Sequence, residues 1–198
     1  LGDVYKRQAV YPMDLINKYG VDSVRYYLAK ELPLGNDGLF SYERFIERYN
    51  NELANDLGNL VSRTVSMVEK YFDGNVPHML TSKTLFDDDL KNVATNAIAK
   101  TKENFEKFEL QEAINETWIL IRRVNKYIDE TAPWVLAKDE NKKSELEATM
   151  ANLIESLRVI AHLVSPYLVE TAPKILEAIG LANDGFNLSN LNYNVGTV

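Results

Sequence analysis

Residues 45–72 read FIERYNNELANDLGNLVSRTVSMVEKYF, and this stretch decides the fold. Apolar side chains recur along it at steps of three and four residues, which predicts one long amphipathic helix. The members of this stripe are Ile46, Tyr49, Leu53, Leu57, Leu60, Thr64 and Val68. The stretch therefore indicates a protein whose core is built from helices.

The other face of this predicted helix carries amides and hydroxyls where a solvated helix usually carries Lys and Glu. Its residues are Asn51, Asn55, Asn59, Ser62 and Ser66, and Arg63 lies one turn past Asn59. Amides and hydroxyls lower helix propensity but can read a base edge by hydrogen bonds. Two interpretations of Asn59 and Arg63 stay open. They form either an ordinary polar flank, or an amide that reads a base beside a guanidinium that holds base or phosphate.

Composition excludes several classes of site. The chain has 198 residues, no cysteine and a formal charge of −7. Disulfides, a thiol nucleophile and thiolate zinc sites are therefore excluded, and His78 and His162 are too far apart in sequence to suggest a metal site. Neither a signal peptide nor an apolar run long enough to cross a membrane is present. The acidic charge argues against a general grip on nucleic acid but is compatible with a local site that reads a few bases.

Further helices follow on either side of the long one. Residues 1–8 carry no helix signal and are interpreted as an artefactual, non-native start. Pro12 is expected to open a short helix that Gly20 ends, and Asp22 to cap the next one. Later helices are expected at 86–108, 109–130, 145–164 and 165–180, with turn residues at 35–38 and a connection at 76–83. Long helices joined by short connections predict an all-α, antiparallel helix bundle at 41–180, with a smaller helical unit at 9–40 and a loosely ordered tail at 181–198.

Motifs of catalysis are absent from the sequence. There is no paired-carboxylate motif, no Ser-His arrangement, no Gly-rich phosphate loop and no two-His helix motif, so no catalytic residue is assigned. Residues 87–89 are three consecutive aspartates. They fit the positive end of a helix dipole better than a metal site, and no metal ligand is assigned.

Trp134 is the best single candidate for a binding residue. It follows Pro133, which fixes the turn before it, and it lies outside any apolar stripe, whereas Trp118 lies within one and is expected in the core. A rigidly presented Trp is suited to stacking on a planar ligand, such as an unstacked base. The alternative is a tryptophan that covers the end of the bundle.

Several blocks of the chain, in the right order, resemble the C-terminal part of the bacterial methionyl-tRNA synthetases. The blocks are FIERYN at 45–50, LANDLGNL at 53–60, SR at 62–63, YFDG at 71–74, TAPW at 131–134 and AK at 137–138. Upstream, PMDLI at 12–16, YGVD at 19–22 and RYYL at 25–28 resemble the segment that follows the KMSKS loop in that family. The resemblance covers residues 10–180 and implies an anticodon-binding helix bundle at 41–180, preceded by a stem-contact segment at 9–40.

The resemblance also implies roles for particular residues. In that family, an Asn and an Arg one turn apart on the long helix and a Trp after Ala-Pro form the anticodon pocket. The matching positions are Asn59, Arg63, Pro133 and Trp134. Trp134 would stack on the first anticodon base, a cytosine, while Asn59 and Arg63 would hydrogen-bond to the CAU anticodon of tRNA(Met).

The departures from the family pattern bound this expectation. The HIGH and KMSKS signatures and the zinc-binding insertion are absent, so the chain is expected to be a fragment that does not activate methionine alone. ATP and Mg²⁺, with Zn²⁺ as a further metal of the family, would belong to the parent cytoplasmic ligase, as would methionine. Two alternatives stay open: the anticodon-binding domain of a leucine, isoleucine, valine or cysteine synthetase, and a protein-interaction bundle with no RNA role.

Overall fold

The computed structural model describes residues 11–32, 40–75 and 82–195, and every regular element within these ranges is a helix. The elements are α1 (Pro12–Tyr19), α2 (Val21–Glu31), α3 (Tyr42–Arg48), η1 (Tyr49–Gly58), α4 (Asn59–Phe72), α5 (Asp87–Glu106), α6 (Leu110–Thr131), α7 (Pro133–Leu136), η2 (Glu140–Lys142), α8 (Lys143–Val164) and α9 (Thr171–Ala178). The predicted all-α fold is confirmed. The expectations for residues 1–8, for the turn at 35–38 and for most of the connection at 76–83 lie outside the described residues.

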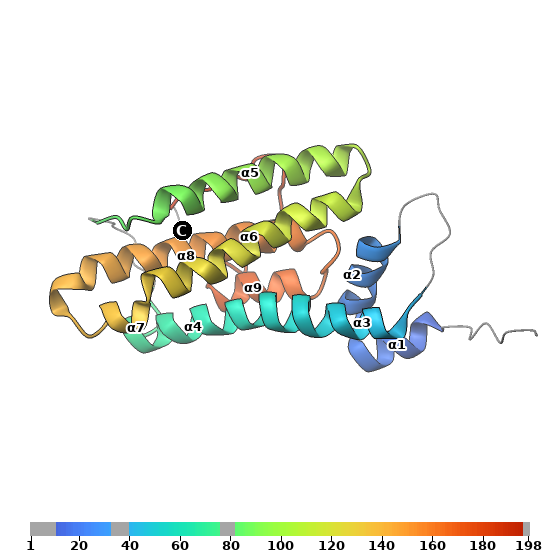
Figure 1. The fold of residues 1–198 in the computed structure, drawn as a ribbon, viewed down its shortest axis with the longest axis horizontal. Helices are drawn as coiled ribbons and strands as arrows, with labels where there is room; N and C mark the ends of the chain where they lie inside the picture. The colour runs from blue at the N-terminus through green and yellow to red at the C-terminus, as the bar shows by residue number, and fades with distance from the viewer. Residues whose placement is uncertain (1–10, 33–39, 76–81, 196–198) are drawn as a thin grey trace, which may run out of the picture.

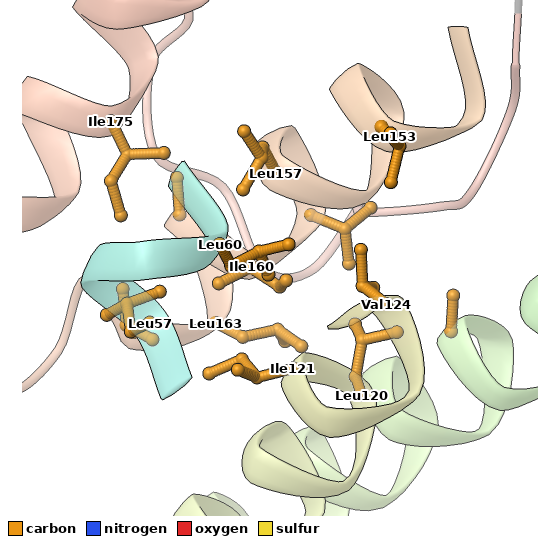
Figure 2. Packing of buried hydrophobic residues seen from close by; sticks show 14 of the residues in the cluster. Leu57, Leu60, Leu120, Ile121, Val124, Leu153, Leu157, Ile160, Leu163 and Ile175 are labelled. Atoms are coloured by element: carbon orange, nitrogen blue, oxygen red, sulfur yellow. The ribbon is translucent and has the colours of Figure 1, made fainter. Parts of the chain in front are cut away.

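The long helices alternate in direction, as an antiparallel bundle requires. In Figure 1, α4 and α6 run from the end that carries α1–α3 toward the end that carries α7, while α5 and α8 run back. Helix α8 lies in the middle of the bundle, and most of its side chains are buried. Helices α3, η1 and α4 follow one another without a break and are called the long rod. Figure 2 shows Leu57 and Leu60 of the long rod facing Ile121 of α6 and Ile160 of α8. Burying a side chain of this size contributes about 1.5–3 kcal/mol, so this contact fixes the rod on the bundle.

The long rod differs from the prediction in its middle part. Residues 49–58 form a π-helix, in which the backbone N–H of Asn59 donates to the carbonyl five residues back. Glu52 and Leu57, five residues apart, are both buried, whereas Leu53 of the predicted stripe is only partly buried. The segment is rich in Asn and ends in Gly, residue types with low α-helix propensity, which lowers the cost of leaving α-helical geometry. The expected single α-helix is therefore corrected to α3, η1 and α4 in succession.

Asp22 has a different role from the one predicted. Helix α2 begins directly after Gly20, whose φ is 84°, so Asp22 lies inside the first turn of α2 and not at its cap. Its carboxylate accepts the backbone N–H of Glu170 at 3.1 Å and that of Thr171 at 2.7 Å. Asp22 therefore caps the start of α9 and ties the N-terminal helices to the bundle.

The C-terminal part also needs correction. The last predicted helix, 165–180, is shorter, because turns occupy residues 165–170 and α9 begins at Thr171. Beyond α9, Tyr193 is 6% exposed and its hydroxyl bonds to Asn152 Oδ1 at 3.0 Å. Lys102 of α5 donates to the carbonyl of Ser189 at 3.0 Å. Tyr193 and the carbonyl of Ser189 thus contact the bundle, while the assignment of residues 181–198 as a loosely ordered tail stays a prediction.

Candidate nucleic-acid interface

Polar side chains join the long rod to α6, which runs parallel to it (Figure 1). Arg122 Nε donates to Asp56 Oδ2 at 3.3 Å, and Asn125 Nδ2 donates to the carbonyl of Asp56 at 3.0 Å. One turn further on, Arg63 Nη2 donates to Asp129 Oδ1 at 3.0 Å. The three α6 positions are three and four residues apart and so share one face of that helix. These contacts place the surface of α4 around Arg63 beside the last turns of α6.

The ion pair of Arg63 is accessible to solvent. The side chain of Arg63 is 32% exposed and that of Asp129 is 66% exposed. An exposed pair of this kind contributes between about 0 and 1 kcal/mol, so another anion or acceptor can replace Asp129 at small cost. A guanidinium carries several N–H donors in one plane, which suits it to a base edge or a phosphate.

Asn59 lies one turn before Arg63 and is exposed at the start of α4. Four residues of helix separate the two Cα atoms by about 6 Å along the axis. Within the described part of the chain, the side-chain amide of Asn59 makes no hydrogen bond. Its donor and acceptor are therefore both available to a ligand.

Trp134 is held by the backbone on either side of it. Ala132 ends α6 in the left-handed conformation, with φ of 43°, and Pro133 is buried at the first position of α7. The indole of Trp134 is 42% exposed, and no aromatic ring of the described residues stacks on it. Burial of this ring inside the bundle is thereby excluded. Trp118, in contrast, is 1% exposed, which confirms it as a core residue.

Helix α7 lies against the far end of α4. A cleft of about 310 Å³ has Tyr71 of α4 and Leu136 of α7 in its lining. Asp129, the partner of Arg63, is five residues before Trp134 in the chain. The structure thus places Asn59 and Arg63 on α4 and Trp134 on the neighbouring α7. The last turns of α6 contact α4 through the Arg63–Asp129 pair and lead directly into α7.

The charge around this surface is mixed. The side chains of Arg122 and Lys126 are 59% and 70% exposed, and Arg122 contacts the rod, whereas Lys126 lies one turn further along α6. Glu130 pairs with Lys126 at 3.2 Å, and Asp56 pairs with Arg122. Such a surface offers a few cations to phosphates without forming a broad basic patch, in keeping with a chain of charge −7.

Asp129, Arg122 and Asn125 were not predicted as site residues from the sequence. Their signal was present, because polar residues at 122, 125 and 129 follow the flank of the apolar stripe of α6 at helical spacing. The partner of each residue depends on how α6 packs against the rod, which a single helix pattern does not contain.

The three aspartates at 87–89 all have partners within the bundle. Asp87 accepts the hydroxyl of Tyr127 at 2.7 Å and the N–H of Thr84 at 3.0 Å. The other two pair with Lys83 and Arg123. Among residues 11–32, 40–75 and 82–195, no group of three or more His, Asp or Glu side chains could hold a metal ion. In the same residues, no helix is both long enough and apolar enough to cross a membrane.

Comparison with known families identifies the chain. Residues 5–65 match the family described as tRNA synthetases class I (M). Residues 78–193, more than half of the chain, match the family described as the anticodon binding domain of methionyl tRNA ligase. The chain therefore belongs to the methionyl-tRNA ligase anticodon-binding family, and the resemblance found in the sequence is confirmed. The predicted boundary between residues 40 and 41 stays a prediction.

Individual relatives agree with this assignment. The methionine–tRNA ligase of Enterococcus faecalis is 50% identical over 188 residues, which are 95% of this chain and 28% of the relative. That of Caldanaerobacter subterraneus subsp. tengcongensis is 50% identical over 179 residues, or 90% of this chain and 28% of the relative. The chain thus spans about 28% of the length of these relatives.

Solved structures show the same fold. The apo form of Mycobacterium tuberculosis methionyl-tRNA synthetase superposes with a TM-score of 0.87 at 34% identity, over 96% of this chain and 39% of that chain. The same enzyme in complex with methionyl-adenylate gives a TM-score of 0.87 over 95% of this chain and 38% of that chain.

Proposed function

We propose that this chain is the part of a methionine–tRNA ligase that recognises tRNA(Met) by its CAU anticodon. The observation that supports this most is the exposed, unstacked indole of Trp134 on a chain of the anticodon-binding family. The whole ligase would activate methionine with ATP and Mg²⁺ and load it on the tRNA in the cytoplasm. Those steps would use the part of the relatives that this chain does not match.

The proposed recognition divides the work among three residues. An unpaired base stacks on the indole of Trp134, because any base offers a π-face to an aromatic ring. The amide of Asn59 donates to and accepts from the edge of a splayed-out base. Arg63 exchanges Asp129 for a base or a phosphate of the anticodon loop.

Two further groups would contribute affinity without sequence preference. Arg122, beside the rod, and Lys126, one turn further along α6, each have more than half of the side chain exposed. Contacts to phosphates position an RNA but do not specify its sequence. Specificity for CAU would therefore rest on the hydrogen bonds of Asn59 and Arg63, while Trp134 would hold the unstacked base.

The test is binding of this chain to a synthetic anticodon stem-loop with a CAU loop, beside one with a changed loop, at one fixed salt concentration. Trp134→Ala should weaken binding to the CAU loop by about 1–3 kcal/mol, the usual scale for one base stacked on an aromatic ring. The matched control is Phe108→Ala, since Phe108 is 75% exposed at the turn between α5 and α6, at the opposite end of the bundle from α7 (Figure 1). Equal affinity of the unmodified chain for both loops, or equal losses in both variants, would refute the proposal.

A further inference from the structure

A cavity of about 440 Å³ lies where the N-terminal helices meet the long rod and α9. Its floor is apolar and well packed, because Leu57, Leu168 and Ile175 are between 1% and 3% exposed. The ring of Tyr49 forms one wall and packs edge-on against Tyr19, with ring centroids 5.7 Å apart. A cavity of several hundred Å³ with this lining has the size and character of a small-molecule site.

The geometry of the rod leaves this space open. Ala54 and Gly58, which line the cavity, belong to the π-helix and have the smallest side chains available. A Cβ on Gly58 would come within 3.2 Å of the carbonyl oxygen of Leu53, so a side chain there would need the backbone to shift by a few tenths of an ångström. π-Helical geometry within a longer helix occurs frequently at functional sites, and η1 has this geometry.

The polar groups of the cavity offer a positive charge to a ligand. Lys174 of α9 is exposed at the rim and makes no ion pair or hydrogen bond within the described part of the chain. Asp22 also lines the cavity, but the N–H groups of Glu170 and Thr171 already occupy its carboxylate. Ser62 adds a hydroxyl that makes no hydrogen bond among the described residues.

We propose that this cavity binds a small amphipathic anion. Its flat apolar body would lie on Leu57, Leu168 and Ile175 against the ring of Tyr49, and its carboxylate would face Lys174. The apolar body gains from leaving water and from edge or face contact with the tyrosine, and the carboxylate gains a charge-assisted partner. Asn59, Arg63 and Trp134 do not line this cavity, so the inference stands apart from anticodon recognition.

The test uses 1-naphthoate as the probe and 1-naphthalenemethanol as its neutral counterpart, with the 198-residue chain followed by NMR and calorimetry. Naphthoate should bind with a dissociation constant on the order of a millimolar or tighter, as expected for a ligand of this size. Its chemical-shift changes should gather on η1 and α9. Lys174→Ala should weaken naphthoate binding about two- to fivefold, the scale of one exposed ion pair, and leave the neutral probe unaffected. Lys91→Ala, at an exposed lysine of α5, is the matched control.

Filling the cavity gives the second arm of the test. Ala54→Phe should weaken both probes about tenfold or more, and Ser62→Leu provides the same test from α4 if Ala54→Phe does not fold. Shift changes scattered over the bundle, or unchanged affinity in a folded filled variant, would overturn the proposal. An equal loss for both probes in Lys174→Ala would overturn the assignment of the anion.

Discussion

The Arg63 guanidinium on α4 and the Asp129 carboxylate on α6 form an ion pair, with Nη2 and Oδ1 3.0 Å apart. Asp129 lies five residues before Trp134 in the chain. The candidate RNA surface therefore carries a negative group beside the cation that is expected to contact the anticodon. An RNA that offers Arg63 a well-placed acceptor can displace Asp129. An RNA that does not leaves the pair in place, so it gains no contact from Arg63 and still brings its phosphates near the exposed carboxylate of Asp129, which disfavours it.

We predict that Asp129→Asn lowers the discrimination between anticodon loops. Affinity for loops other than CAU should rise about two- to fivefold, the scale of one exposed charge, because the substitution removes a repulsive group. Stability should change by less than about 1 kcal/mol, since the pair is exposed. Binding of both stem-loops to both proteins measures the effect, and Asp88→Asn on α5, at a similarly exposed aspartate, is the control. A loss of affinity for every loop would show instead that Asp129 only orients Arg63.

Asp22 provides a second prediction, on how the N-terminal helices are held. Its carboxylate accepts the N–H groups of Glu170 and Thr171 at the start of α9, so Asp22→Ala removes a cap supplied by another helix. The free energy of unfolding should fall by about 1–2 kcal/mol, as for the loss of other N-caps. Urea denaturation should show a lower midpoint with an unchanged slope. Asp14→Ala, at an exposed acid in the first turn of α1, should change the midpoint little.

The role of Asp22 also shows which features the sequence determines. Its position after Gly20 predicts a helix start correctly, because Gly ends one helix and the next begins beside it. The N–H groups that donate to its carboxylate belong to the start of α9, almost 150 residues later in the chain. Local signals therefore predict where helices begin and end, whereas the partner of a capping side chain depends on tertiary packing.

The long rod shows the same difference between features set by local sequence and features set by tertiary packing. Its ends, at Ser41 and Asp73, follow from a capping hydroxyl and a left-handed residue, and both are predictable from the sequence. The π-helix between them was not predicted, because Leu53 fits the apolar spacing of three and four residues that is typical of an α-helix. The five-residue step from Glu52 to Leu57 becomes visible only when Glu52 is known to be buried. A buried glutamate is not expected from sequence unless its partners are known.

For the candidate site, too, the sequence predicted the exposed residues but not their partners in the fold. Trp134 after Pro133 and the amide-rich face of α4 are sequence features, and the structure leaves Asn59 and Trp134 exposed. Asp129 could not be assigned as the partner of Arg63, because that contact depends on the parallel packing of α6 along the rod.

Glu52 is the centre of the polar contacts at the junction with α2, and it carries the third prediction. It is 4% exposed, accepts the hydroxyl of Tyr26, and pairs with Arg48 at 2.9 Å and with Arg122 at 3.6 Å. Glu52→Ala leaves the buried hydroxyl of Tyr26 without its acceptor, whereas Arg48 keeps Glu31 and Arg122 keeps Asp56. A buried partner that loses its charge pair altogether costs up to about 3–5 kcal/mol. We expect a smaller loss of about 1–3 kcal/mol, because both arginines are partly exposed and can be rehydrated.

Chemical denaturation measures this loss, and Glu103→Ala is the matched control. Glu103 pairs with Lys107 four residues later on the exposed face of α5, where the side chains are 59% and 54% exposed. Removal of that pair should change stability by no more than about 0.5 kcal/mol. Similar losses in the two variants would contradict a structural role for the Glu52 contacts.

Four buried tyrosines make the free energy of unfolding depend on pH in the alkaline range. Burial raises the pKa of Tyr26, Tyr127, Tyr167 and Tyr193 above the ordinary value of 10.0, and the neighbouring Glu52 adds to the effect at Tyr26. In the unfolded chain these hydroxyls lose their protons near pH 10, while the folded chain keeps them. The unfolded state then binds fewer protons, so the free energy of unfolding falls as pH rises above 10.

The slope of this fall depends on how many tyrosines stay protonated only in the folded chain. Each tyrosine that stays protonated only in the folded state contributes a decrease of about 1.4 kcal/mol per pH unit. Urea denaturation followed by circular dichroism at several values between pH 9 and 11.5 gives the slope. Tyr167→Phe should make it shallower by one tyrosine's share, because the phenyl ring fills the same buried space without a proton to lose. Tyr11→Phe, at a 66% exposed position, is the control. A slope that is the same in Tyr167→Phe as in the unmodified chain would mean that Tyr167 loses its proton at the same pH in both states, and that the packing around it opens before the chain unfolds.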